Sequence, residues 1–199
     1  NGVIVEQGGA ANFNDLGLQQ IDNCIFVNFR GYSVDYPMGG RGTFSKVNNC
    51  AFLPLPVSSG GGGVAIRWPN DFPDHNNGNR HVTKCYSADT LLVIGNTQNG
   101  FIEKNTVGVP DSKSSIVFVG NPLKLVIQGN RFAHAGNLLT FRGVEHTIGN
   151  NVIASEVAFD PSCVDVHFAP DNTFFGFNGF VPFSTNSIET DKEIQYTPV

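Results

Sequence analysis

The sequence predicts an all-β fold, a right-handed, single-stranded parallel β-helix of about seven coils. Three observations point to it: a motif that recurs along the chain, a second family of short apolar strands in step with the first, and a composition that disfavours long helices. The 199 residues include 23 Gly and 17 Phe but a single Met, and no apolar pattern with helical spacing persists for four turns. Short strands separated by many turns are therefore expected.

The recurring motif has an apolar residue first, Cys or Asn fourth and, in most copies, an apolar residue sixth. Its seven copies begin at Ile21, Val47, Val82, Ile102, Ile127, Ile148 and Phe175. The fourth residues are Cys24, Cys50, Cys85, Asn105, Asn130, Asn151 and Asn178. Successive copies lie 20 to 35 residues apart, which suits one coil of a parallel β-helix with loops of different lengths.

A second set of short apolar strands runs in step with this motif. Its members are residues 3–5, 33–35, 64–66, 91–93, 116–118, 138–140 and 164–166. Because one coil cannot bury its apolar side alone, we expect the coils to stack, with backbone hydrogen bonds along the axis and about 4.8 Å between rungs. An Asn column suits such stacking, since the amide can bond the backbone of the next coil. The alternative is an ordinary sandwich in which strands and turns alternate by chance.

The solenoid is expected to occupy residues 1–181. Residues 182–199 lose the motif and carry Ser, Thr and acidic side chains, which predicts a C-terminal cap or linker. The first residues read as a mid-solenoid strand without a cap, so we expect the chain to be a fragment of a longer protein or to have its open end covered by a partner.

Composition and charge exclude several classes of function. The net charge is −5, and twelve Lys and Arg are spread thinly, so no basic stripe is available for nucleic acid. No segment approaches the roughly 20 apolar residues of a membrane span. The four cysteines form no CxxC pair, and we expect no metal site and no cofactor. Three of them share one interior column, where free thiols act as apolar fillers; a disulfide is the alternative. Three histidines on different coils are expected at the surface or in turns: His134, His146 and His167.

Charged residues on the second strand family form the first candidate site. If the apolar column points inward, Glu6, Asp35 and Arg67 form an outward ladder on adjacent coils. Carboxylates about 5 Å apart are typical of a retaining glycosidase, and an arginine beside them could bind an acidic sugar. We therefore predict Glu6 and Asp35 as catalytic, with Arg67 and the neighbouring Tyr36 as substrate-binding residues. Simple solvation of an exposed strand is the alternative.

The one large insertion in the repeat, between Phe52 and Val82, is the second candidate site. Loops that interrupt a regular repeat often carry function. Here Trp68 could offer a flat platform to a pyranose ring, and His75 could assist it as a substrate-binding residue. Asp71 and Asp74 could serve as acid and base. The alternative is that the indole covers the core beneath its own loop and the aspartates form turns.

The coil motif with its interior Asn column resembles the pectin-lyase-like superfamily of right-handed parallel β-helices. The resemblance covers roughly residues 1–181 and is one of fold, because the acidic motifs of polygalacturonases and the calcium cluster of pectate lyases are absent. Among its members the chain is most similar to phage tailspikes and tail fibres that recognise polysaccharide. The resemblance implies a homotrimer, in the virion or outside the cell, that binds and often cleaves a bacterial surface polysaccharide.

The leading hypothesis is therefore the binding, and cleavage by a carboxylate pair, of a bacterial surface polysaccharide. Two alternatives stay open: a secreted polysaccharide lyase or glycosyl transferase of the same fold, and a non-catalytic structural shaft or adhesin. A lyase would release unsaturated sugars, which a hydrolase does not. Replacing the carboxylates would leave the binding of an adhesin intact while removing the turnover of an enzyme.

Overall fold

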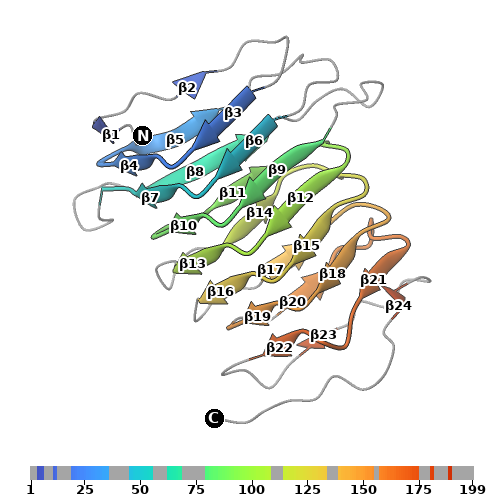
Figure 1. Cartoon of the computed structure of the whole chain (residues 1–199). Coiled ribbons are helices and arrows are strands. Elements are labelled where there is room, and N and C mark those ends of the chain that lie inside the picture. The colour runs from blue at the N-terminus through green and yellow to red at the C-terminus, as the bar shows by residue number, and fades with distance from the viewer. Residues whose placement is uncertain are drawn as a thin grey trace.

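The computed structural model describes residues 4–6, 11–12, 19–35, 45–55, 62–68, 79–108, 114–133, 139–154, 157–174, 180–181 and 188–189. Within these ranges the regular structure consists of short strands, and every strand pair is parallel. Figure 1 shows the strands stacked along one axis, with the N-terminal coils in blue at one end and the C-terminal coils in red at the other. The chain is a parallel β-helix.

The chain visits three sides in turn. Side A contains β1 (Ile4–Glu6), β4 (Ile25–Val27), β7 (Ala51–Leu53), β10 (Tyr86–Ser87), β13 (Thr106–Gly108), β16 (Arg131–Ala133), β19 (Val152–Ile153) and β22 (Thr173–Phe174). Side B contains β2 (Ala11–Asn12), β5 (Arg30–Asp35), β8 (Gly62–Trp68), β11 (Leu92–Ile94) and β14 (Ile116–Phe118), followed by a separate sheet of β17 (Leu139–Phe141), β20 (Val157–Phe159) and β23 (Phe180–Val181). Side C contains β3 (Gln19–Asp22), β6 (Ser45–Asn48), β9 (Arg80–Thr83), β12 (Gly100–Glu103), β15 (Val126–Gln128), β18 (Thr147–Gly149), β21 (Val166–Phe168) and β24 (Ile188–Glu189).

The recurring motif crosses the corner between sides C and A. Its first residue lies on side C, in a column that runs in register from the partly buried Ile21 to Ile148 and is fully buried from Val47 on. Its sixth residue lies on side A, where Phe26 and Phe52 stack with ring centroids 4.9 Å apart. The third residue takes a left-handed backbone conformation with φ between 53° and 64°, which Asn and Gly tolerate well. These corner residues are Asn23, Asn49, Lys84, Lys104, Gly129 and Asn150.

Buried asparagines form a hydrogen-bonded ladder at the same corner. The Nδ2 of Asn105 donates to Oδ1 of Asn130 at 2.9 Å, and Asn130 Nδ2 donates to Oδ1 of Asn151 at 3.0 Å. Asn151 Nδ2 continues the row to Oδ1 of Asn172 at 2.9 Å. Each of these Nδ2 groups also donates to a backbone carbonyl of the preceding coil. Buried polar groups must be paired, and this ladder pairs them along the axis while fixing the register of the coils.

Three parts of the predicted repeat were wrong. The last copy of the motif is not at residues 175–180: Phe168 pairs with Ile148, and Asn172 takes the place predicted for Asn178. Ile4 and Val5, predicted as part of the second strand family, do not belong to it, because β1 pairs with β4 on side A. Residues 164–166 do not belong there either, since β21 lies on side C. A short apolar strand looks the same on all three sides, so its composition does not reveal its side.

Strand pairing extends beyond the predicted end of the solenoid. The strand β24 pairs with β21, with Ile188 opposite Val166 and Glu189 opposite His167. Sides A and C each hold eight strands among the described residues, against the about seven coils that the sequence predicts. The boundary at residue 181 stays a prediction.

Candidate functional site: a groove along one corner

The structure brings two members of the predicted charged ladder together and separates the third. Asp35 of β5 and Arg67 of β8 are in-register neighbours on side B. The Arg67 guanidinium carbon lies 4.5 Å from the centre of the Tyr32 ring. The ladder was wrong for Glu6, which lies on side A opposite Val27. The neighbour of Asp35 on the preceding coil is Asn12 instead, so Glu6 and Asp35 do not form a carboxylate pair on one face.

Trp68 lies in the core, so the prediction of a sugar platform was wrong. Its side chain is 1% exposed. A Cβ on Gly100 would lie 2.8 Å from the indole and 2.6 Å from the Leu125 side chain, which shows that the ring occupies space left by the missing side chain. The indole packs against Gly100 inside the solenoid and cannot offer its face to a ligand.

The other predicted site residues cannot be placed. Tyr36, Asp71, Asp74 and His75 lie outside the described residues, and of Asp35 only the backbone is described. Their assignment as catalytic or substrate-binding residues stays a prediction.

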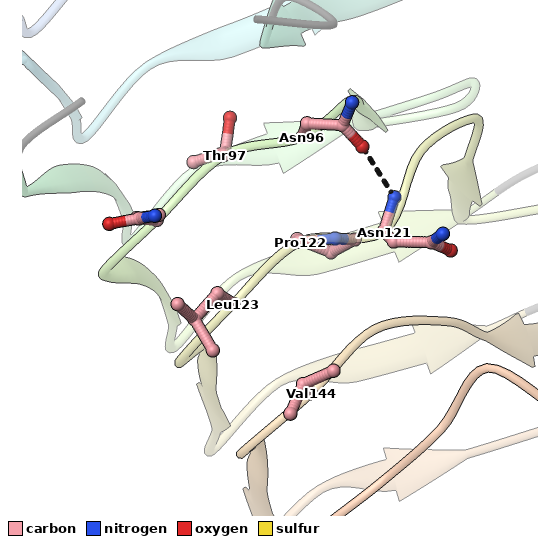
Figure 2. Close-up of a pocket in the computed structure, with 7 residues that line it drawn as sticks. Asn96, Thr97, Asn121, Pro122, Leu123 and Val144 are labelled. Atoms are coloured by element: carbon pink, nitrogen blue, oxygen red, sulfur yellow. Dashed lines mark hydrogen bonds between the residues drawn. The ribbon is translucent and has the colours of Figure 1, made fainter. Parts of the chain in front are cut away.

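Sequence reasoning missed a groove of roughly 380 Å³ at the corner between sides B and C. Its lining comes from three successive coils: Asn96, Thr97, Gln98, Asn121, Pro122, Leu123 and Val144. Figure 2 shows Asn96 at one rim, with its side-chain oxygen accepting a hydrogen bond from the backbone nitrogen of Asn121 at 2.7 Å. Pro122 and Leu123 follow one another on one coil, and Val144 lies beside Leu123 on the next coil.

The corner has this shape because the coils pair there by single bridges instead of strands. Gln98, Leu123 and Val144 are parallel bridge partners on successive coils. Leu123 donates its backbone N–H to Thr97 at 2.8 Å, and Val144 donates to Pro122 at 2.9 Å. The next residue of each coil turns the chain onto side C with φ between 51° and 57°. These residues are Asn99, Lys124, Glu145 and Asp165.

Gly143 is required at this corner for two reasons. Its φ of 105° lies in a region that side chains disfavour. A Cβ there would also overlap the Pro122 carbonyl oxygen, which accepts the hydrogen bond from Val144. The close approach of these two coils therefore depends on glycine.

His146 supports the same corner from the inside. The sequence places it at the surface or in a turn, but its side chain is 1% exposed. Its Nδ1 accepts from the Leu125 backbone N–H at 3.1 Å, so its Nε2 carries the proton and donates to the Arg142 carbonyl at 2.8 Å. Burial disfavours the charged ring and lowers its pKa to about 4, although the hydrogen bond to Arg142 acts in the opposite direction. The ring is therefore neutral at pH 7.

The groove itself is lined by uncharged residues, and its charged neighbours pair with each other. Amide side chains come from Asn96, Gln98 and Asn121, and the remaining lining is Thr97 and apolar side chains. On the adjoining ridge Lys124 forms an ion pair with Glu145 at 3.3 Å. The site can donate and accept hydrogen bonds and can contact apolar groups, but its lining supplies no acid or base.

The outer face of side C carries a group of polar and titratable side chains. There Asn48 links Asp22 and Thr83 by hydrogen bonds of 2.9 Å. The His81 ring stacks on Phe101 with centroids 4.5 Å apart, and burial lowers its pKa. This face is a hydrogen-bonded polar surface.

Within the described ranges no cluster of three or more His, Cys, Asp or Glu residues is arranged to hold a metal ion. Among the same residues, no helix has the length and apolar character needed to cross a bilayer.

Comparisons with known proteins give the chain no family. No protein-family model and no curated protein matches the sequence. One solved structure, described as full-length QnrB1, a plasmid-mediated fluoroquinolone resistance protein, aligns with 92% of this chain and 94% of its own. The two are 10% identical and the TM-score is 0.22. A TM-score this low supports no inference about this protein. Its assignment as a β-helix comes from the parallel pairing of its own strands.

Proposed function

We propose that this protein binds an extended polysaccharide whose chain lies along the groove. The observation that carries the proposal is that one groove crosses three successive coils, with amide side chains lining it on the first two coils and apolar side chains on the last two. Coils are about 4.8 Å apart, which is comparable to the length of one sugar residue in an extended glycan. A polymer lying parallel to the axis would therefore contact amide groups towards one end of the groove and apolar side chains towards the other.

The chemistry of the lining suits sugars. A hydroxyl group both donates and accepts, and the side-chain amides of Gln98 and Asn121 can act both as donors and as acceptors. The C–H faces of a sugar ring can pack against Pro122, Leu123 and Val144, while the hydroxyls meet the amide rim. Because no lining side chain is charged, the proposal favours a glycan that is neutral where it touches the groove.

The identity of the glycan and of the assembly belongs to the proposal as well. The resemblance to tailspikes points to a bacterial surface polysaccharide and to a homotrimer in the virion or outside the cell. The net charge of −5 agrees with a partner that is not a polyanion.

Cleavage is proposed for the neighbouring face of side B and not for the groove. Asp35 would supply one carboxylate and Asp71 or Asp74 the second, with Arg67 bound to the sugar. The in-register position of Arg67 next to Asp35 supports this arrangement. A lyase or transferase and a non-catalytic shaft or adhesin stay as alternatives.

The test measures binding of the purified chain to a panel of bacterial capsule and lipopolysaccharide glycans. For a glycan that binds, the double variant Gln98→Ala with Asn121→Ala should lose about tenfold or more in affinity, because each lost hydrogen bond contributes about 0.5–1.5 kcal/mol. The control is Thr106→Ala, an exposed position on side A, which should bind as the wild type does.

Two outcomes would overturn the proposal. The first is that no glycan of the panel binds, which would favour the structural shaft. The second is that the double variant binds as tightly as the control, which would place the binding site elsewhere. In the same assay Asp35→Asn should abolish the release of shortened chains without weakening binding; unsaturated products would instead identify a lyase.

A further inference from the structure

Three cysteines stack on successive coils at the corner between sides C and A. Ala51 donates its backbone N–H to the carbonyl of Cys24 at 2.9 Å, and Tyr86 donates to the carbonyl of Cys50 at 2.9 Å. Cys24, Cys50 and Cys85 therefore occupy the same position on neighbouring rungs, about 4.8 Å apart. Disulfides join residues whose Cα atoms are roughly 4.4–6.8 Å apart, so neighbouring members of this column meet that requirement.

The thiols of this column touch one another and are all free. Cys50 lies within hydrogen-bonding contact of the thiols of both Cys24 and Cys85. Their access to solvent differs. Cys24 is half-buried, whereas Cys50 and Cys85 are 3% and 2% exposed. A soluble reagent can therefore reach the column at Cys24, and Cys50 is the thiol placed to act next.

We propose that Cys24 and Cys50 are a redox pair that forms a disulfide by exchange with a small soluble disulfide such as oxidised glutathione. In the first step the Cys24 thiolate attacks one sulfur of glutathione disulfide, which forms a mixed disulfide and releases one glutathione. In the second step the Cys50 thiolate attacks the Cys24 sulfur and releases the second glutathione. The two protein thiols give up two electrons, and their two protons end on the two glutathione molecules.

The surroundings of Cys50 favour its role as the resolving thiol. A hydrogen bond from the Cys85 thiol lowers the pKa of Cys50 to about 7, although burial acts in the opposite direction. The same hydrogen bond and burial raise the pKa of Cys85, so Cys85 stays a thiol and supports its neighbour. A thiolate, and not a thiol, is the nucleophile in exchange.

The fourth cysteine provides an internal comparison. Cys163 is fully buried and donates from Sγ to the Phe141 carbonyl at 3.2 Å. Burial raises its pKa to about 11. It lies outside the column, so it should stay reduced under conditions that oxidise the pair. This inference does not depend on glycan binding, because the column and the groove lie at different corners.

The experiment maps disulfides in the full chain after equilibration with oxidised glutathione, blocking of free thiols and digestion with trypsin under non-reducing conditions. The digest separates the four cysteines, because residues 1–30, 47–67, 85–104 and 143–192 each contain one. The expected result is a cross-link between the first two peptides, with a mass lower by two hydrogen atoms than their sum. Cys85→Ser and Cys163→Ser should keep this cross-link.

Three results would overturn the proposal: all four thiols stay free, Cys24 of the wild type accumulates as a stable glutathione adduct, or Cys50 pairs with Cys85 instead. The variant Cys50→Ser should trap the glutathione adduct at Cys24. If this variant fails to fold, the wild-type map alone decides, because each of its outcomes supports or contradicts the pair.

Discussion

Replacing Asn130 with Ala removes the central member of the asparagine ladder. Its Oδ1 accepts from the backbone N–H and the Nδ2 of Asn105 at 3.0 and 2.9 Å. Its Nδ2 donates to the Ile102 carbonyl at 2.8 Å and to Asn151 at 3.0 Å. In the variant, the Asn105 side-chain Nδ2 still donates to the Val82 carbonyl. The backbone N–H of residue 130 still donates to Asn151 Oδ1. The Asn105 backbone N–H, however, loses its acceptor inside the core.

The loss is therefore one or two orphaned buried groups and a small cavity. An orphaned group costs about 1–3 kcal/mol, and the missing side-chain volume adds about 1 kcal/mol. We expect the free energy of unfolding, measured by urea denaturation, to fall by about 3–5 kcal/mol. Asn121→Ala is the matched control, because its side chain is exposed and should change stability by no more than about 0.5 kcal/mol. Equal stability of the two variants would refute the ladder as a source of stability.

Two further predictions concern the corner that forms the groove. Because the pKa of His146 is lowered to about 4 from an ordinary 6.5, the unfolded chain binds the proton more tightly, and stability present above pH 6.5 should be lost as the pH falls to 4. The expected loss in the free energy of unfolding is about 3 kcal/mol. Urea denaturation across this pH range should show that the free energy of unfolding of His146→Gln depends less on pH than that of the wild type. The same pH dependence in both proteins would contradict the assignment. Gly143→Ala should lower the free energy of unfolding by at least about 3 kcal/mol, because of the left-handed φ and the overlap with Pro122. Gly108→Ala, whose Cβ would meet no atom within 4 Å, should change it little, and similar losses for both would refute the role of Gly143.

The repeat could be predicted from sequence because the interior columns are chemically uniform. The first position of the motif is Ile or Val on side C in every confirmed copy, and the fourth is a small polar or thiol side chain at the corner. Like side chains stack on like because each coil presents the same space to the next. The last copy was missed because residues 169–172 form a corner one residue longer than residues 149–151, which breaks the spacing but not the column.

The groove could not be predicted in the same way, although a signal was present. Asn96 and Asn121 lie 25 residues apart, the same spacing as Asn105 and Asn130 on the same two coils. That agreement marks a second asparagine column, but sequence alone does not say that this one faces outward. Trp68 was wrongly predicted as a sugar platform because an aromatic ring suits both a sugar-binding surface and a core. Only its packing against Gly100, which has no side chain, shows that the indole lies in the core.

A crystal structure of the chain tests the stacking of coils most directly. It should place the amides of Asn105, Asn130, Asn151 and Asn172 in one continuous buried row, each oxygen accepting from the amide of the coil before it. Antiparallel strand pairing, or the same four amides pointing to solvent from unrelated elements, would contradict the coil register and with it the groove, the thiol pair and the binding proposal.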